Sequence, residues 1–290
     1  MRMDDQDESQ NVEDARGSGG GFQFGPLHGV GIGTVLIAIV GGWFFGINPL
    51  QILGLLSGNG SNVSSAPEPA PTAPSAGDPT VHFVSQILRS TEVVWGHAFA
   101  ELGRTYQDPK LLLYRDSYPT ACGYGDAAAG PFYCPNDRRI YLDLSFFDVM
   151  TRQLGAPGQF AHAYVVAHEV GHHVQTLLGI LDREGAAGRN GGAGAAGHSV
   201  RIELQADCFA GVWAKRSQSE HGWRLEAGDI ESALNAAAQI GDDTLQRRSQ
   251  GTVVPDTFTH GTSAQRVKWF SRGVEAGDIK ACDTFATPQL

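Results

Sequence analysis

Apolar residues recur at every third or fourth position in several stretches of the chain, the spacing that places them on one face of an α-helix. These stretches cover residues 79–102, 160–178, 199–215, 223–247 and 263–270. In residues 139–144 apolar and polar residues alternate instead, which predicts a half-buried strand. We therefore expect residues 80–290 to form one α+β domain that is mainly helical and contains a small sheet.

The N-terminal part of the chain differs from this domain in composition. Residues 1–28 are polar, acidic and rich in glycine, which predicts a disordered tail. Residues 30–47 carry no charged side chain, so we predict a single transmembrane helix over residues 29–48. The alternatives are a buried core helix or a cleaved signal peptide, although a signal peptide would start nearer the N-terminus with basic residues. Residues 49–79 are rich in Pro, Ser and Gly, which predicts a linker.

The distribution of charge predicts an orientation and excludes one class of partner. Arg16 precedes the apolar segment, and no Lys or Arg follows it until Arg89. This asymmetry favours a single-pass protein of the cell membrane with a cytoplasmic N-terminus and an extracytoplasmic domain. The net charge of -10 leaves no basic stripe to neutralise phosphates, so nucleic acid is not an expected partner.

Cysteine usage is compatible with that orientation. Cys122, Cys134, Cys208 and Cys282 could form two disulfides in an oxidising compartment, or remain four thiols in a reducing one. A bond between Cys122 and Cys134 would close a turn-rich loop and contribute roughly 3 kcal/mol. Cys208 and Cys282 could then tie the end of the chain to residues 199–215. No Cys-x-x-Cys spacing occurs, so a four-cysteine zinc site is not expected.

The stretch 160–178 contains His168, Glu169 and His172 in a His-Glu-x-x-His pattern. On a helix the two imidazoles leave the same face one turn apart and can bind one metal ion. Glu169 then lies beside the metal, where a carboxylate can take the proton of a metal-bound water. The alternative is a helix whose histidines are solvated or bonded within the core.

The next predicted helix supplies a candidate third ligand. Glu203 and Asp207 stand four residues apart on one face of the stretch 199–215. A catalytic zinc takes three protein ligands and keeps one position open, and Glu203 is the best candidate to complete the set. Asp207 would accept the other imidazole N–H of a ligand histidine and fix its tautomer. Paired acids on a helix are otherwise usually a solvated face.

Several motifs together resemble the bacterial predicted neutral zinc metallopeptidase family, whose members are gluzincin-like. They are His168-Glu-Val-Gly-His-His-Val-Gln175, Glu203-Leu-Gln-Ala-Asp-Cys-Phe-Ala-Gly211, Cys122-Gly-Tyr-Gly with Gly130-Pro-Phe-Tyr-Cys-Pro135, and Thr259-His-Gly-Thr-Ser-Ala-Gln-Arg266. The likeness covers nearly the whole chain. It implies a zincin-like fold behind one membrane span, zinc bound by His168, His172 and Glu203, and Glu169 as general base. The resemblance does not predict the shape of the cleft, because the Gly- and Ala-rich residues 185–198 form a segment whose length can vary.

Two further features of such a site have weaker candidates. Zinc peptidases often add a side chain that donates to the developing oxyanion. His260 is our first choice, with Arg266 and Tyr133 behind it, although a turn histidine bonded to the backbone is an equal alternative for His260. A strand near the metal helix commonly offers an open edge to extended substrate, and we assign this role to residues 139–144.

These observations predict a membrane-anchored, zinc-dependent metallopeptidase with one Zn²⁺ per chain and a peptide or protein substrate. Glu169 and His260 are the expected catalytic residues. A zinc-stabilised binding or scaffold module at the cell envelope that lacks turnover is the alternative, and a membrane-anchored interaction protein without metal is a third. The sequence does not predict the oligomeric state.

Overall fold

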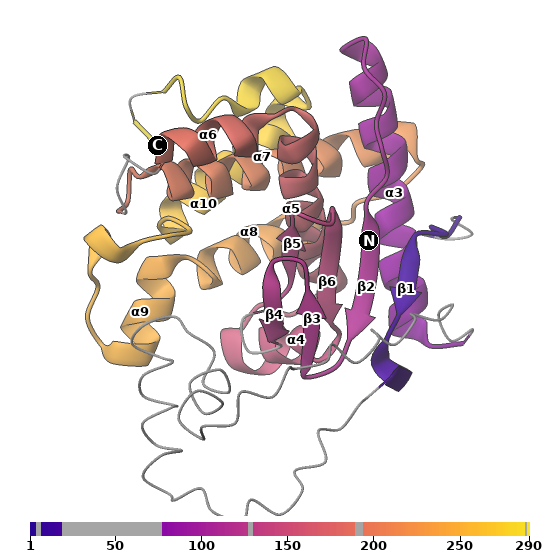
Figure 1. Ribbon diagram of the computed structural model, residues 1–290, viewed down its shortest axis with the longest axis horizontal. Helices are drawn as coiled ribbons and strands as arrows, with labels where there is room; N and C mark the ends of the chain where they lie inside the picture. The colour runs from indigo at the N-terminus through magenta and orange to yellow at the C-terminus, as the bar shows by residue number, and fades with distance from the viewer. Residues whose placement is uncertain (4–6, 19–76, 127–129, 189–193, 288) are drawn as a thin grey trace, which may run out of the picture. The chain divides into compact units, whose positions relative to one another are not determined.

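The computed structural model describes residues 1–3, 7–18, 77–126, 130–188, 194–287 and 289–290. Within these ranges the chain is mainly helical and contains a small mixed sheet, which confirms the predicted α+β class. The N-terminal strand, the sheet and the helices that follow it form one compact unit (Figure 1).

A four-stranded sheet has the strand order β1-β2-β6-β5. Its strands are β1 (Val12–Asp14), β2 (Lys110–Tyr114), β6 (Arg139–Asp143) and β5 (Phe132–Cys134). β1, β2 and β6 are parallel, whereas β5 runs antiparallel to β6 with Tyr133 opposite Ile140. Parallel strands are covered on both faces and are therefore continuously apolar, as in β2, where Leu111, Leu112 and Leu113 are all fully buried.

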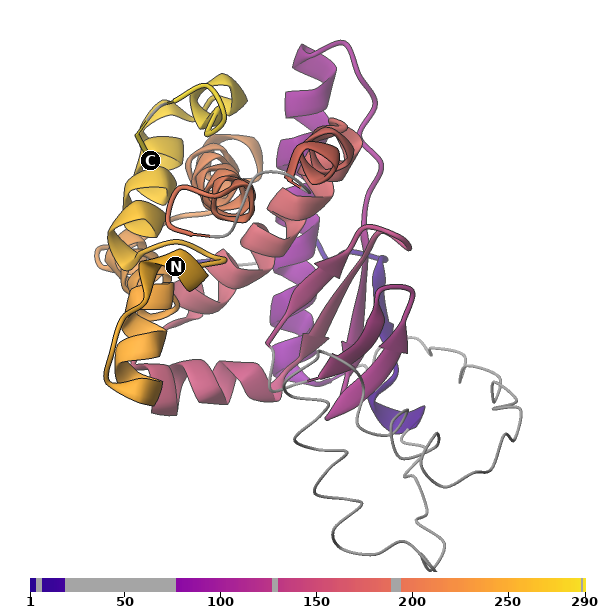
Figure 2. The same cartoon turned by 60° about the vertical axis from the view of Figure 1, so that its left-hand side comes forward.

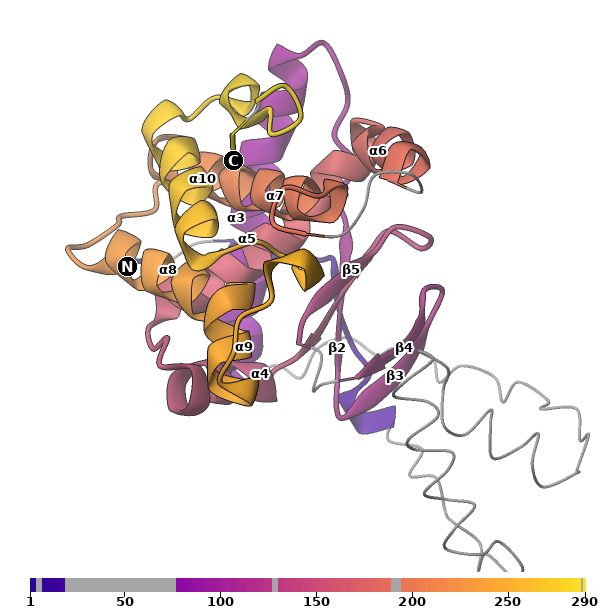
Figure 3. The same cartoon turned by 90° about the vertical axis from the view of Figure 1, so that its left-hand side faces the viewer.

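Helices pack against this sheet. They are α3 (Pro79–Glu101), α4 (Ser145–Val149), α5 (Gln159–Leu177), α6 (Ile180–Gly188), α7 (His198–Glu220), α8 (Asp229–Gln239), α9 (Asp242–Gln250) and α10 (Ser263–Ala276), with short turns of other helical types at Arg16–Ser18, Met150–Leu154, Pro255–Thr257 and Ile279–Cys282. α5 contacts both β5 and α7, and Figures 2 and 3 show it between the sheet and the pair α7 and α10. The predicted helical stretch 223–247 is two helices, α8 and α9, which are separated at Gly241.

Glycines bring three of these helices into backbone contact. A Cβ atom on Gly273 of α10 would lie 2.0 Å from the carbonyl oxygen of Cys208, and one on Gly211 of α7 would lie 2.2 Å from a carbonyl oxygen of α10. Gly171 of α5 is also close to α7, since a Cβ there would lie 3.0 Å from Ala206. Side chains at these positions would push the helices apart, so the glycines set the spacing between α5, α7 and α10.

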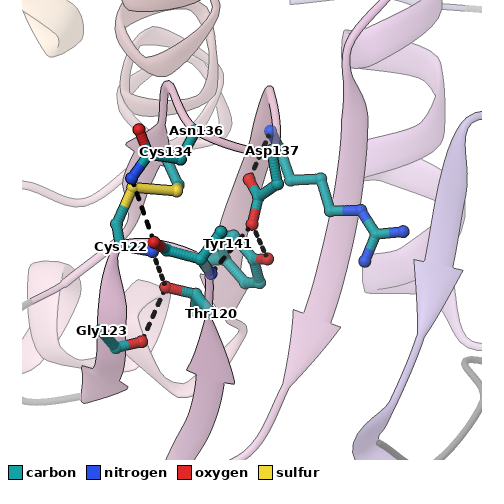
Figure 4. The surroundings of a disulfide bond; sticks show 9 residues. Thr120, Cys122, Gly123, Cys134, Asn136, Asp137 and Tyr141 are labelled. Atoms are coloured by element: carbon teal, nitrogen blue, oxygen red, sulfur yellow. Dashed lines mark hydrogen bonds between the residues drawn. A yellow bond between two sulfur atoms is a disulfide. The ribbon is translucent and has the colours of Figure 1, made fainter.

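Both predicted disulfides are present. Cys122–Cys134 joins the end of β5 to a hairpin of β3 (Ser117–Thr120) and β4 (Gly123–Asp126), and Asp137 next to it accepts hydrogen bonds from Ala121 N and the Tyr141 hydroxyl (Figure 4). Cys208–Cys282 ties the C-terminal segment to α7. The four cysteines are therefore all paired, as expected for a protein of an oxidising compartment.

The prediction of a disordered tail over residues 1–28 is wrong for the part of it that the structure describes. Residues 12–14 form β1 and pair with residues 111–113 of β2. Val12 and Ala15 are buried, and the acidic Asp14 is paired with Arg16. Composition suggested disorder because the tail has few apolar residues, but its acidic groups find cationic partners in the folded protein and its backbone completes a sheet.

The predicted membrane span over residues 29–48 lies outside the described residues, as does most of the predicted linker over residues 49–79. Among the helices that the structure does describe, none is both long and apolar enough to cross a membrane. The described part of the chain resumes at Gly77, and α3 begins at Pro79 with Asp78 as its N-cap.

Candidate metal centre

Two helices bring the three predicted metal ligands together. His168 and His172 lie one turn apart on α5, and Glu203 lies on the first half of α7. One ligand atom from each residue lies within 4.8 Å of the others, with the Nε2 of His168 3.1 Å from a Glu203 oxygen. Two imidazole nitrogens and a carboxylate oxygen are a donor set that zinc prefers, so the residues present fit this metal.

A buried network fixes the orientation of His168. The Nδ1 atom of His168 lies 2.8 Å from Asp207 Oδ1, which also accepts a hydrogen bond from the Tyr164 hydroxyl. Arg266 donates to both oxygens of Asp207 from its Nε (2.9 Å) and Nη2 (2.8 Å) atoms. Asp207 therefore holds the Nδ1 proton of His168 and leaves Nε2 free for a metal, which is the role predicted for it.

The second histidine has a partner that the sequence analysis missed. His172 Nδ1 lies 2.9 Å from Gln175 Oε1, so the amide oxygen of Gln175 accepts the Nδ1 proton. The amide nitrogen of Gln175 in turn donates to the Ile202 carbonyl and to Gln205 of α7. The available signal was its spacing, because a residue three positions after His172 lies on the same helix face.

Glu169 lies beside the ligands in a cavity of about 540 Å³, which His168, His172 and Glu203 also line. The side chain is buried, and this burial raises the pKa of Glu169, an effect that the nearby histidines partly oppose. Burial also opposes the charge of Glu203, but the two histidines outweigh it and hold the pKa of Glu203 well below its ordinary value. The arrangement thus places one permanently charged carboxylate among the ligands and a second, more basic one next to them.

The three candidates for the oxyanion donor occupy different environments. His260 lines the cavity at the turn before α10, where Asp242 accepts from its backbone N and lies 3.3 Å from its Nδ1. The hydrogen bond between the His260 side chain and Asp242 is the main reason that the pKa of His260 is raised. Asp242 was not singled out in the sequence, and it also accepts from the backbone of Thr259 and Gly261, which fixes the turn.

Arg266 and Tyr133 also line the cavity but have other partners. The guanidinium of Arg266 is buried and is bonded to Asp207 and Tyr164, so it supports a ligand rather than facing a substrate. The Tyr133 hydroxyl lies 3.1 Å from Nδ1 of His173, whose Nε2 donates to the Gln107 carbonyl. Nδ1 of His173 is therefore an acceptor, and the phenol proton of Tyr133 points to it.

The edge strand of the sheet beside the candidate ligands is β5 and not the predicted strand at residues 139–144. β6, at Arg139–Asp143, is paired on one side with β2 and on the other with β5, so neither of its edges is free. Among the described strands none pairs with the outer edge of β5, and Phe132 and Tyr133 of β5 line the cavity of the metal ligands. The alternating pattern identified a strand, but the order of strands in a sheet depends on contacts that are distant in sequence.

Residues 1–285 match the family described as "Putative neutral zinc metallopeptidase". The chain belongs to this family. The zinc metallopeptidase family thus accounts for nearly the whole chain, including β1 and the metal-ligand helices.

One relative matches the chain over nearly its full length. The uncharacterized protein YpfJ of Escherichia coli (strain K12) is 47% identical over 292 residues, which cover 98% of this chain and 99% of that protein. The uncharacterized protein Rv2575 of Mycobacterium tuberculosis (strain ATCC 25618 / H37Rv) is 47% identical over 194 residues, covering 64% of this chain and 65% of that one. No solved structure matches the chain. Membership in the zinc metallopeptidase family implies zinc and a peptide or protein substrate.

Proposed function

We propose that the protein is a zinc-dependent peptidase that binds one Zn²⁺ per chain through His168, His172 and Glu203. The observation that carries this proposal is the convergence of three ligand atoms within 4.8 Å, with Glu169 beside them in a cavity of about 540 Å³. A scaffold site would need the ligands alone. The adjacent carboxylate and the open cavity favour hydrolysis over a structural metal site.

Bound zinc would polarise a water molecule and the scissile carbonyl group. Glu169 takes a proton from the attacking water and then gives it to the nitrogen of the breaking C–N bond, so that an amine and a carboxylate leave. Burial raises the pKa of Glu169, which makes this carboxylate a better proton acceptor than an exposed one. His260 donates to the oxyanion that develops on the carbonyl oxygen, and Asp242 holds the turn that presents it.

The substrate enters as an extended segment along β5. Main-chain hydrogen bonds to the free edge of this strand orient the scissile bond, while Phe132 and Tyr133 form the cavity wall on that side. Residues 29–48 attach the protein to a membrane, and the two disulfides support placement of the domain in an extracytoplasmic compartment.

The test uses the full chain, because β1 is part of the folded unit. Cleavage of a peptide library and zinc content are measured for the wild type, Glu169→Gln and Glu203→Ala, with the exposed Glu231→Gln on α8 as the matched control. We expect Glu169→Gln to keep zinc but lose cleavage, Glu203→Ala to lose both, and Glu231→Gln to behave as wild type. Full cleavage by Glu169→Gln would refute the proposed base, and zinc binding without cleavage in the wild type would favour a scaffold module.

A further inference from the structure

The N-terminal strand is an integral part of the sheet. β1 pairs in parallel with β2 through three residue pairs, and the Ala15 N donates to the Leu113 carbonyl at 2.8 Å. Val12 and Asp14 of β1 are buried. Without β1, the edge of the sheet would be β2, whose continuously apolar residues Leu111, Leu112 and Leu113 are all buried in the complete sheet.

The residues just before β1 donate hydrogen bonds to a buried carboxylate of α3, Glu92, whose cationic partner is Arg89 of the same helix. Glu92 is buried and accepts hydrogen bonds from the Ser9 hydroxyl and from the Asn11 side-chain amide at 2.8 Å. The Ser9 backbone N also donates to the carbonyl of Ser85 on α3. Without the N-terminal segment one oxygen of this buried carboxylate would lose both of its hydrogen-bond donors, so the segment stabilises α3.

The chain leaves and re-enters this folded unit at almost the same point. Arg16, directly after β1, donates to Asp14 and also to Asp78, each at 2.8 Å. Asp78 is the N-cap of α3, so a single guanidinium connects the two described segments that precede and follow residues 19–76 in the sequence. No Asp, Glu, Lys or Arg occurs in the sequence between Arg16 and Glu68.

We infer that β1 and the metal-site domain lie on the same side of the membrane to which the protein is attached. A single crossing would place β1 and β2 in different compartments, where they could not pair. Exchange of β1 between two copies would not change this, because the second copy presents its β2 on the same side as the first.

This inference revises the predicted orientation of the N-terminus. That prediction rests on Arg16 as the cytoplasmic positive charge, but in the folded protein Arg16 is paired with two carboxylates of the domain. With the domain in an oxidising compartment, residues 1–18 are there too. The inference rests on the proposed membrane attachment but not on peptidase activity.

The experiment labels single added cysteines with a membrane-impermeant maleimide in spheroplasts of a bacterial host. The full-length wild type is the blank, because its four cysteines are all disulfide-bonded. Gln10→Cys reports on the N-terminal segment and Ser249→Cys on the domain, since both positions are exposed. Asp7→Cys with Ser219→Cys is a second exposed pair in case a variant of the first does not fold. Labelling after detergent lysis gives the total amount of the added cysteine that can react in each variant.

We expect the two positions of a pair to be labelled to the same extent in spheroplasts, with the wild-type chain in the membrane fraction and released by detergent. Labelling of one position and protection of the other would overturn the inference, as would recovery of the wild type in the soluble fraction. Because labelling requires no catalysis, an absence of peptidase activity would refute the proposed function and leave this result unaffected.

Discussion

Replacing Arg266 by Met tests whether the network around Asp207 holds the site together. Arg266 is 2% exposed and Asp207 is fully buried, so the variant leaves a carboxylate without its main counter-charge inside the protein. Breaking a buried ion pair from one side costs about 3–5 kcal/mol. For a domain of this size 1 kcal/mol lowers the melting temperature by about 2–4 °C, so we expect a decrease of about 6–20 °C.

The measurement is thermal unfolding of the full chain followed by circular dichroism, in chelator so that metal binding does not contribute. Asp207→Asn in the Arg266→Met background removes the stranded charge, and the double variant should therefore be less destabilised than the sum of the two single variants by about 1–3 kcal/mol. Lys268→Met removes an exposed cation from the same helix and should change stability by less than about 0.5 kcal/mol. A shift for Arg266→Met as small as that of the control, or strictly additive effects in the double variant, would refute the reasoning.

Three further predictions concern helix packing and metal binding. Gly273→Ala places a methyl group against a carbonyl oxygen of α7 and should lower the free energy of unfolding by about 1–3 kcal/mol, measured by urea titration. The control is Gly96→Ala on α3, where a Cβ meets nothing within 4 Å, and this variant should not be destabilised. In the metal-free protein burial lowers the pKa of His168, but Asp207 outweighs it and raises this pKa to about 10, so zinc must displace a proton below that pH. Zinc affinity measured by competition with a chelator should rise up to about tenfold per pH unit from pH 6 to 8, and a constant affinity would contradict this. Gln175→Leu removes the hydrogen-bond acceptor for Nδ1 of His172 and should weaken zinc binding by about 10–100-fold. An unchanged zinc affinity would mean that Gln175 does not support His172.

The grouping of the candidate metal ligands was predictable in part, because it depends on spacing within single helices. The four-residue separations in His168–His172 and Glu203–Asp207 place each pair on one helix face, and the structure brings the two faces together. The role of Arg266 was not predictable. The orientation of its guanidinium is set by a hydrogen bond to Asp207, which is distant in sequence.

The N-terminal strand could not be predicted for a related physical reason. β1 has few apolar residues, and it is stable because its backbone pairs with β2 and because Glu92 and Asp78 supply polar partners from α3 and its cap. Local composition reports none of these contacts. The same limit explains the misassigned sheet edge, since only the register of β5 with β6 shows which of the two strands is free on one side.

The backbone contact of α7 with α10 at Gly211 and Gly273 also restricts motion. Helices that touch through their main chains have no side-chain layer between them that could deform, and the Cys208–Cys282 bond pins the segment after α10 to the same helix. We therefore expect α7 and α10 to move as one rigid body that carries Glu203, Asp207 and Arg266 together. A change in the width of the cavity then has to come from the walls that α7 and α10 do not form, which include β5 and α4.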